Sequence, residues 1–159
     1  QPTAGELREA IAVRAELEGL AGRLAAPRMT AATLRQLEDL FEKMARAAQR
    51  GDAHEQAVHN TRFHTIIVRA AGNRALERIW AMLEPFGRTY VTASMPGVDL
   101  GWLGERHREI IEALRDRDPE RAGAALRQHA VEAASLIAKL SDEQPVPPAG
   151  GGPPGGLPV

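Results

Sequence analysis

The sequence contains no cysteine among its 159 residues, so it forms no disulfide and offers no thiolate to a metal. It also has no surplus of positive charge, because 20 Lys and Arg residues stand against 21 Asp and Glu residues. Non-specific binding of nucleic acid depends on basic side chains that neutralise phosphates. We therefore expect that this segment does not bind DNA by itself, and that any metal is held by nitrogen and oxygen atoms.

Long apolar runs are missing as well, since none approaches the roughly 20 residues that a membrane span needs. The N-terminal residues 1–5 have no signal-peptide character. The expectation is a soluble, cytoplasmic protein without a membrane partner.

Strand-like alternation does not occur, and apolar residues instead recur with the 3.6-residue period of a helix from Glu6 to about Ser141. The pattern predicts an all-α fold, an antiparallel bundle of six to seven helices joined by short loops. Length favours a single domain, which we place at residues 1–141. Residues 142–159 are rich in proline and glycine and are predicted to form a tail outside the core.

Local signals divide the helical part of the chain. Pro27 ends the first helix, and Asp118-Pro119 begins the last. Pro85 falls inside the fourth helix and should kink or split it. The predicted helices span approximately residues 4–26, 31–50, 53–71, 74–92, 99–115 and 119–140. The inward face of the first is predicted to carry Ala10, Val13, Leu17, Leu20, Ala21 and Leu24.

Three histidines lie on apolar faces of separate predicted helices: His64, His107 and His129. Asn60 precedes His64 by one helical turn, so the two side chains share a face. Burial of an imidazole without partners costs about 1–3 kcal/mol. A single buried histidine is most simply explained by a hydrogen bond to a carbonyl or a carboxylate. Three that face one core indicate a shared divalent metal.

Other polar and aromatic residues have less specific interpretations. His54 and His59 fall off the line of Asn60 and are predicted to be solvated or to flank the site. Arg14 and Arg88 are candidates to line a pocket, because arginine is rarely buried without an anionic partner. Five aromatic residues are predicted to lie in the core or in a pocket wall, namely Phe41, Phe63, Trp80, Phe86 and Trp102.

Short motifs between Glu6 and Leu140 occur in an order that is typical of one family. They are Arg14-x-x-Leu17-Glu18, Phe63-His64 before Ala71-Gly72-Asn73, residues 105–114, Arg117-Asp118-Pro119 and Arg127-Gln128-His129. In these the chain resembles the effector-binding C-terminal domain (FCD, or FadR C-terminal type) of GntR-family bacterial transcription regulators. The resemblance implies a helical bundle that binds a small organic acid, often through a metal held by one Asp or Asn and three histidines. Residue by residue, it implies the ligands Asn60, His64, His107 and His129.

Two departures from the family pattern carry consequences. Many metal-binding members have aspartate where this chain has Asn60, and an amide oxygen is a neutral, weaker ligand. An effector carboxylate would then supply the missing negative charge, so metal and effector binding should be coupled. Members also carry a winged helix-turn-helix domain ahead of the effector domain, and nothing in this sequence resembles one. DNA binding is therefore expected only through an N-terminal domain absent from this sequence.

The resulting prediction is a ligand-sensing regulatory domain, not an enzyme, that binds a small carboxylate metabolite through zinc, nickel or manganese and forms a homodimer. The predicted site consists of the metal ligands Asn60, His64, His107 and His129 and the effector-binding residues Arg14 and Arg88. One alternative is a metal-dependent hydrolase or lyase, but the third, fifth and sixth predicted helices offer no inward acid to act as general base. The other alternative is a helical interaction module without a ligand. This alternative would have to attribute the inward position of three histidines to coincidence.

Overall fold

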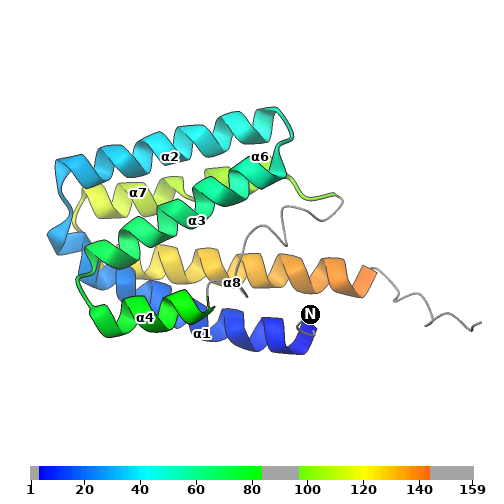
Figure 1. Ribbon diagram of the computed structural model, residues 1–159, viewed down its shortest axis with the longest axis horizontal. Coiled ribbons are helices and arrows are strands. Elements are labelled where there is room, and N and C mark those ends of the chain that lie inside the picture. The colour runs from blue at the N-terminus through cyan, green and yellow to red at the C-terminus, as the bar shows by residue number, and fades with distance from the viewer. Residues whose placement is uncertain (1–3, 84–96, 144–159) are drawn as a thin grey trace, which may run out of the picture.

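The computed structural model describes residues 4–83 and 97–143, and the statements below concern these ranges. All regular structure in them is helical, which confirms the all-α prediction. The helices are α1 (Ala4–Ala25), α2 (Ala31–Gln49), α3 (Ala53–Ala70), α4 (Arg74–Leu83), α6 (Leu100–Glu105), α7 (Arg108–Arg115) and α8 (Pro119–Glu143), with a 3-10 turn at Ala26–Arg28. Consecutive helices from α1 to α4 alternate in direction, and α1 packs along α8 in the opposite direction (Figure 1).

Helix ends follow the local chemistry that the sequence indicated. The side chains of Thr30 and Asp52 accept the backbone N–H three residues further on, at 3.1 and 2.8 Å, and so cap α2 and α3. Asp99 caps α6 in the same way. Gly72 follows α3 with a φ of 65°, a left-handed conformation that suits glycine at a helix end.

The predicted fifth helix is two helices, and His107 lies at the break between them. In a continuous helix the Gly104 carbonyl would accept the backbone N–H of Arg108. Instead the backbone N–H of His107 donates to it at 3.1 Å, and the Nδ1 atom of His107 lies 3.0 Å from the same oxygen. The capture of this carbonyl by His107 ends α6, so His107 projects from a junction and not from a helix face.

The ends of the fourth and the last predicted helices lie at or beyond the edges of the described residues. The structure follows the fourth helix to Leu83, so Pro85 and Arg88 lie outside the described residues. The last helix continues to Glu143, and residues 144–159 of the Pro/Gly-rich tail are likewise outside. In the parts of the chain that are described, no helix is both long and apolar enough to cross a bilayer.

The buried face of α1 differs from the predicted one. Val13 is 52% exposed, whereas Arg14 and Glu18 are buried. Glycine brings α1 against α8, since a Cβ atom on Gly22 would lie only 2.7 Å from the Ala122 carbonyl oxygen. This close backbone approach sets the rotation of α1 and turns the Arg14 and Glu18 side chains toward the interior.

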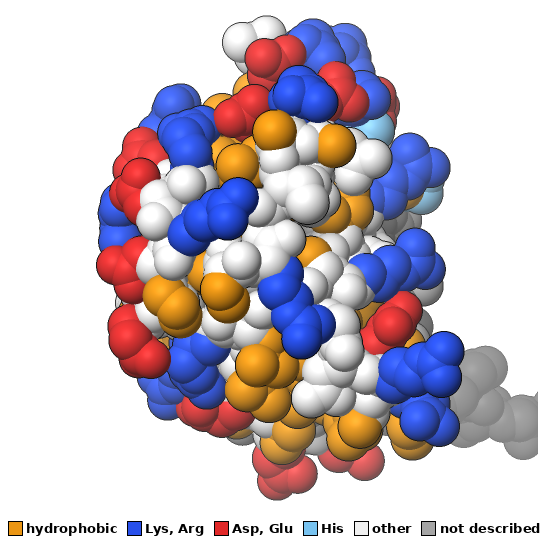
Figure 2. All heavy atoms as spheres, turned by 90° about the vertical axis from the view of Figure 1, so that its left-hand side faces the viewer, with side chains coloured by type: hydrophobic (Ala, Val, Ile, Leu, Met, Phe, Trp, Pro, Cys, Tyr) orange, Lys and Arg blue, Asp and Glu red, His pale blue; other side chains and the backbone are white. Residues whose placement is uncertain are grey.

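The apolar core lies between α2, α3, α7 and α8. Its fully buried side chains include Leu37, Met44, Phe63, Ile110 and Leu114. Trp80 is also buried, but Trp102 is 44% exposed and stands outside the core. At one end of the bundle, basic and acidic side chains lie next to one another, in keeping with the near-zero net charge (Figure 2).

Candidate functional site

The three predicted histidines meet in the interior of the bundle. His64 comes from α3, His107 from the junction before α7, and His129 from α8. One ring nitrogen of each lies within 4.8 Å of the other two, and all three side chains are buried. Centroids are 5.5 Å apart for His64 and His107, 5.1 Å for His64 and His129, and 4.4 Å for His107 and His129. Within the described ranges this is the one group of such side chains that could hold a metal ion.

The size of this triangle is near that of a metal site. Two nitrogens that each lie about 2.1 Å from one tetrahedral ion are about 3.4 Å apart. The upper separation of 4.8 Å is wider than this, and the rings would have to move inward by somewhat less than about 1 Å each to bind one ion. Neutral imidazole is a preferred ligand of zinc, copper, iron and nickel. The donor set and its spacing thus fit one divalent ion.

His107 has an acceptor oxygen next to each ring nitrogen. Nδ1 lies 3.0 Å from the Gly104 carbonyl oxygen, and the tautomer with its proton on Nδ1 leaves the lone pair of Nε2 for a metal. Burial, reinforced by the charge of His64, lowers the pKa of His107 to about 3, so the ring is neutral at pH 7. Nε2 lies 2.7 Å from Oδ1 of the buried Asn60. Two lone pairs that converge in this way are a donor set for a cation.

His129 is also kept in the ligand form. Burial lowers its pKa well below the usual value, and electrostatic interaction with the His107 and His64 rings lowers it further. Its ring stacks on His64 with an angle of 22° between the planes. A proton therefore does not compete with a metal for His129 near neutral pH.

Glu18 of α1 is the site residue that the sequence analysis missed. Its Oε2 atom lies 2.9 Å from Nδ1 of His64, while Arg14 Nε and Trp80 Nε1 donate to Oε1 at 2.5 and 3.2 Å. Burial alone would raise the pKa of this carboxyl group. The charges of His64 and Arg14 outweigh that effect and hold the pKa well below its usual range. A buried negative charge thus lies directly behind one of the three imidazoles.

A signal for Glu18 exists in the sequence. It occupies a stripe with helical spacing that the structure buries, Ile11, Ala15, Glu18, Gly22 and Ala25. A glutamate in such a stripe is as anomalous as a histidine. The sequence analysis looked for an acid only on the helices that carry the histidines, whereas this acid comes from α1.

The predicted effector residue Arg14 lies in the same network. Besides its bond to Glu18, its guanidinium lies 5.1 Å from the centre of the Trp80 ring. Its Nη1 atom is buried and has no hydrogen-bond partner within residues 4–83 and 97–143. An N–H group of this kind is a free donor for an anion.

The two histidines predicted to be solvated or flanking differ from each other. His54 is exposed, as expected. His59 is buried instead, with Nε2 3.4 Å from Oε1 of Glu55 one turn earlier on α3. Neither belongs to the cluster of three imidazoles.

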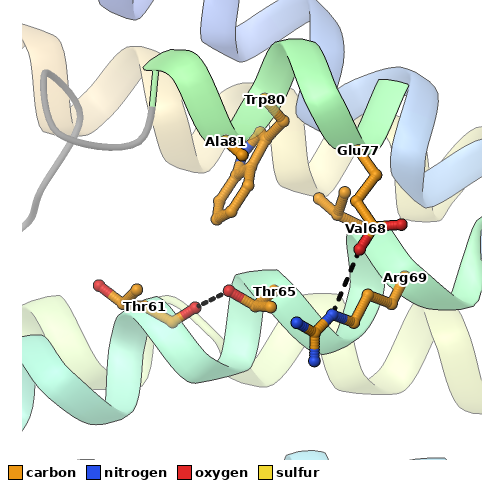
Figure 3. A pocket seen from close by; sticks show the side chains of 7 residues that line it. All are labelled: Thr61, Thr65, Val68, Arg69, Glu77, Trp80 and Ala81. Atoms are coloured by element: carbon orange, nitrogen blue, oxygen red, sulfur yellow. Dashed lines mark hydrogen bonds and ion pairs between the residues drawn. The ribbon is translucent and has the colours of Figure 1, made fainter. Parts of the chain in front are cut away.

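A hollow of about 310 Å³ lies between α3 and α4, next to the buried network (Figure 3). Thr61 and Thr65 line it from α3, and the ion pair of Arg69 and Glu77 lies at one end. Trp80 forms a wall of this hollow and also donates to Glu18, so α4 is tied to the buried site through its indole.

Comparison with known proteins establishes the family. Residues 9–132 match the family model of the FCD domain. The chain belongs to the FCD domain family. This FCD domain is 38% identical over 124 residues to a probable D-xylose utilization operon transcriptional repressor of Paenarthrobacter nicotinovorans, which covers 78% of the chain and 54% of the relative. It is 28% identical over 120 residues to the HTH-type transcriptional regulator McbR of Escherichia coli, with 72% and 53% covered.

Solved structures agree on the fold. Escherichia coli McbR/YncC superposes with a TM-score of 0.77 at 24% identity, over 91% of this chain and 72% of that one. Streptococcus agalactiae GntR gives a TM-score of 0.70 at 24% identity, over 85% and 61%. The FCD domain spans about half the length of the curated relatives it matches. Those relatives are named as transcription regulators, in line with the prediction of a regulatory domain.

Proposed function

We propose that this FCD domain is the ligand-sensing part of a cytoplasmic GntR-type transcription regulator. Support comes from the two curated relatives, which are named as transcription regulators and are about twice as long as the matched region. In this proposal a winged helix-turn-helix domain outside this sequence binds DNA, and the FCD domains pair as a homodimer. Ligand binding shifts α1 and α4 and thereby changes the spacing of the DNA-binding domains.

The sensing site is proposed to hold one divalent metal on His64, His107 and His129, with the Asn60 amide oxygen beside them. The convergence of three buried imidazoles within 4.8 Å is the observation that carries this proposal. Zinc and nickel suit imidazole best, whereas manganese prefers oxygen ligands, so we rank zinc and nickel ahead of manganese. The metal supplies a positive centre for an anionic ligand.

The ligand is proposed to be a small organic acid. Imidazoles that bind a metal are neutral, so three of them and an amide contribute no charge, and the negative charge of Glu18 is offset by Arg14 at 2.5 Å. A divalent ion would therefore keep its double positive charge until an anion arrives. One carboxylate oxygen can bind the metal while another accepts from the free Nη1 of Arg14. Arg88 remains a predicted second partner for the anion.

Metal analysis of protein purified without chelator tests the proposal. We expect one equivalent of metal per chain and a higher melting temperature when zinc, nickel or manganese is added to stripped protein. His64→Ala should abolish the shift. His54→Ala removes an exposed histidine from the same helix and should leave the shift intact. Absence of both metal and shift would instead favour the ligand-free helical module.

A further inference from the structure

Glu18 makes contacts that a purely structural carboxylate would not need. We infer that Glu18 is a positioning residue of the metal site, which fixes the tautomer of His64 so that Nε2 is left for the metal. The inference rests on the proposed metal site but concerns a residue outside the ligand set. It is carried by the way in which side chains from three helices converge on one carboxylate.

The two oxygens of Glu18 have different partners. Oε1 accepts from Arg14 Nε at 2.5 Å and from Trp80 Nε1 at 3.2 Å, so α1 and α4 together hold it. Oε2 lies 2.9 Å from His64 Nδ1 at an ion-pair distance without hydrogen-bond geometry, and neither buried atom has a hydrogen-bond partner among the described residues. A His64 ring that binds a metal carries one proton, and an ionised carboxylate only accepts, so that proton belongs on Nδ1. Nε2 then carries the lone pair.

The same arrangement occurs at a second ring of the cluster. The Gly104 carbonyl faces Nδ1 of His107 at 3.0 Å, as Glu18 faces Nδ1 of His64. Metal-binding histidines usually donate their other N–H group to a carboxylate or a carbonyl, which fixes the ring and raises its basicity. Two of the three imidazoles thus have the outer partner that a ligand needs.

The burial of Glu18 favours a positioning role over a role in packing alone. Glu18 and Arg14 are 2% and 5% exposed, and removing two such charges from water destabilises the folded state before their attraction is counted. A core histidine can be satisfied by a carbonyl alone, as His107 shows at Nδ1. The buried charge at His64 is explained if that ring must keep a fixed tautomer beside a cation.

Zinc affinity of metal-stripped protein, measured by competition with a chelator, tests the inference. Glu18→Gln keeps the shape of the side chain but removes its charge and should weaken zinc binding about 10- to 100-fold. Glu16→Gln is the matched control, because Glu16 lies on the same helix but is exposed and pairs with Arg127 at 2.6 Å. It should leave zinc affinity unchanged.

Nitrogen-15 NMR of the histidine rings in the stripped protein gives a readout that does not depend on the metal. In the wild type, at an alkaline pH where the His64 ring carries a single proton, we expect that proton on Nδ1. In Glu18→Gln the amide can donate as well as accept, so the Nε2–H form should become populated. Trp80→Phe keeps the carboxylate but removes one donor that holds it, and it should show the same change more weakly if Glu18→Gln does not fold.

The outcomes separate the two proposals. If Glu18→Gln binds zinc with the affinity of the wild type and keeps the wild-type tautomer of His64, the proposed role of Glu18 is wrong. The proposed metal site is unaffected by that result. A wild type that binds no zinc would overturn the metal site. In that case an unchanged His64 tautomer in Glu18→Gln would also show that Glu18 does not fix the tautomer of His64.

Discussion

At the scale of single residues, burial determines the chemistry of the site. His107 and His129 are enclosed so completely that they stay neutral at pH values where an exposed histidine would be partly protonated. A metal therefore does not have to displace protons from these two rings at pH 7. The same burial destabilises the metal-free domain at acidic pH, because the unfolded chain binds protons at these two histidines and the folded domain does not.

The metal-free domain should become less stable as the pH falls below about 6.5. The pKa of His107 is about 3 in the folded state and about 6.5 in the unfolded chain, so between these values only the unfolded chain binds the proton. Each such histidine lowers the free energy of unfolding by up to about 1.4 kcal/mol per pH unit. The pKa of His129 is lowered too, which adds to the loss. Glu18, whose pKa is also lowered, contributes stability that is lost below about pH 4.5.

Urea denaturation of stripped protein at pH 7 and pH 5 measures this effect. His107→Asn removes one of the titrating groups and should give a shallower pH dependence. Equal free energies of unfolding at the two pH values would contradict the prediction.

Asn60→Asp should strengthen metal binding and weaken the coupling between metal and effector. The aspartate would provide a charge that the wild type must obtain from the incoming anion. In the wild type we expect a carboxylate to raise zinc affinity by about 1–3 kcal/mol, and zinc to raise carboxylate affinity by the same factor. Calorimetric titration of zinc with and without a panel of hydroxy and sugar acids measures both. Identical zinc affinities across the panel would argue against an anion-sensing pocket.

At the scale of helices, the sequence predicted the elements well but not their junctions or their rotation. Helical period and capping residues placed α2 and α3 correctly, because both signals are local. The break at His107 depends on a side chain capturing the Gly104 carbonyl, which periodicity does not reveal. The rotation of α1 depends on how Gly22 meets α8, a property of two distant segments. Glu18 was missed for this second reason.

Gly22→Ala should disturb the site from a distance. Its Cβ atom would lie 2.7 Å from the Ala122 carbonyl oxygen, so α1 and α8 must separate. Overpacking of this kind destabilises a domain by about 1–3 kcal/mol. Since α1 carries Arg14 and Glu18, zinc affinity should fall as well.

Thermal melting and zinc titration of the same sample test both effects. Glu16→Ala trims an exposed side chain of α1 and serves as the control, with a small change in stability and none in zinc affinity. A Gly22→Ala domain with wild-type stability would show that the contact between α1 and α8 adapts freely.

At the scale of the whole molecule, we predict a homodimer that uses α1 and α4. Met82 and Ile79 of α4 are 75% and 48% exposed, and Val13 is exposed on α1, which packs against α4. Large apolar side chains gathered on neighbouring helices are typical of an interaction surface. Light scattering at micromolar concentration should give twice the chain mass of 17.2 kDa.

Met82→Glu should shift this equilibrium toward the monomer, because it places a charge in the apolar surface. Trp102→Gln alters an exposed aromatic residue on α6 and should leave the dimer intact. A wild-type species of 17.2 kDa alone would contradict the dimer.

The position of Trp80 also gives the molecule an optical signal of its own. The chain has two tryptophans, and they differ sharply: the indole N–H of Trp80 is bonded to a buried carboxylate, whereas Trp102 is partly in water. Indole emission responds to nearby charge and to solvent, so the two fluorophores should emit at different wavelengths. In a Trp102→Phe background the remaining emission would come from a side chain that touches both Glu18 and the hollow between α3 and α4. Occupancy of the buried site could then be followed in real time without a label.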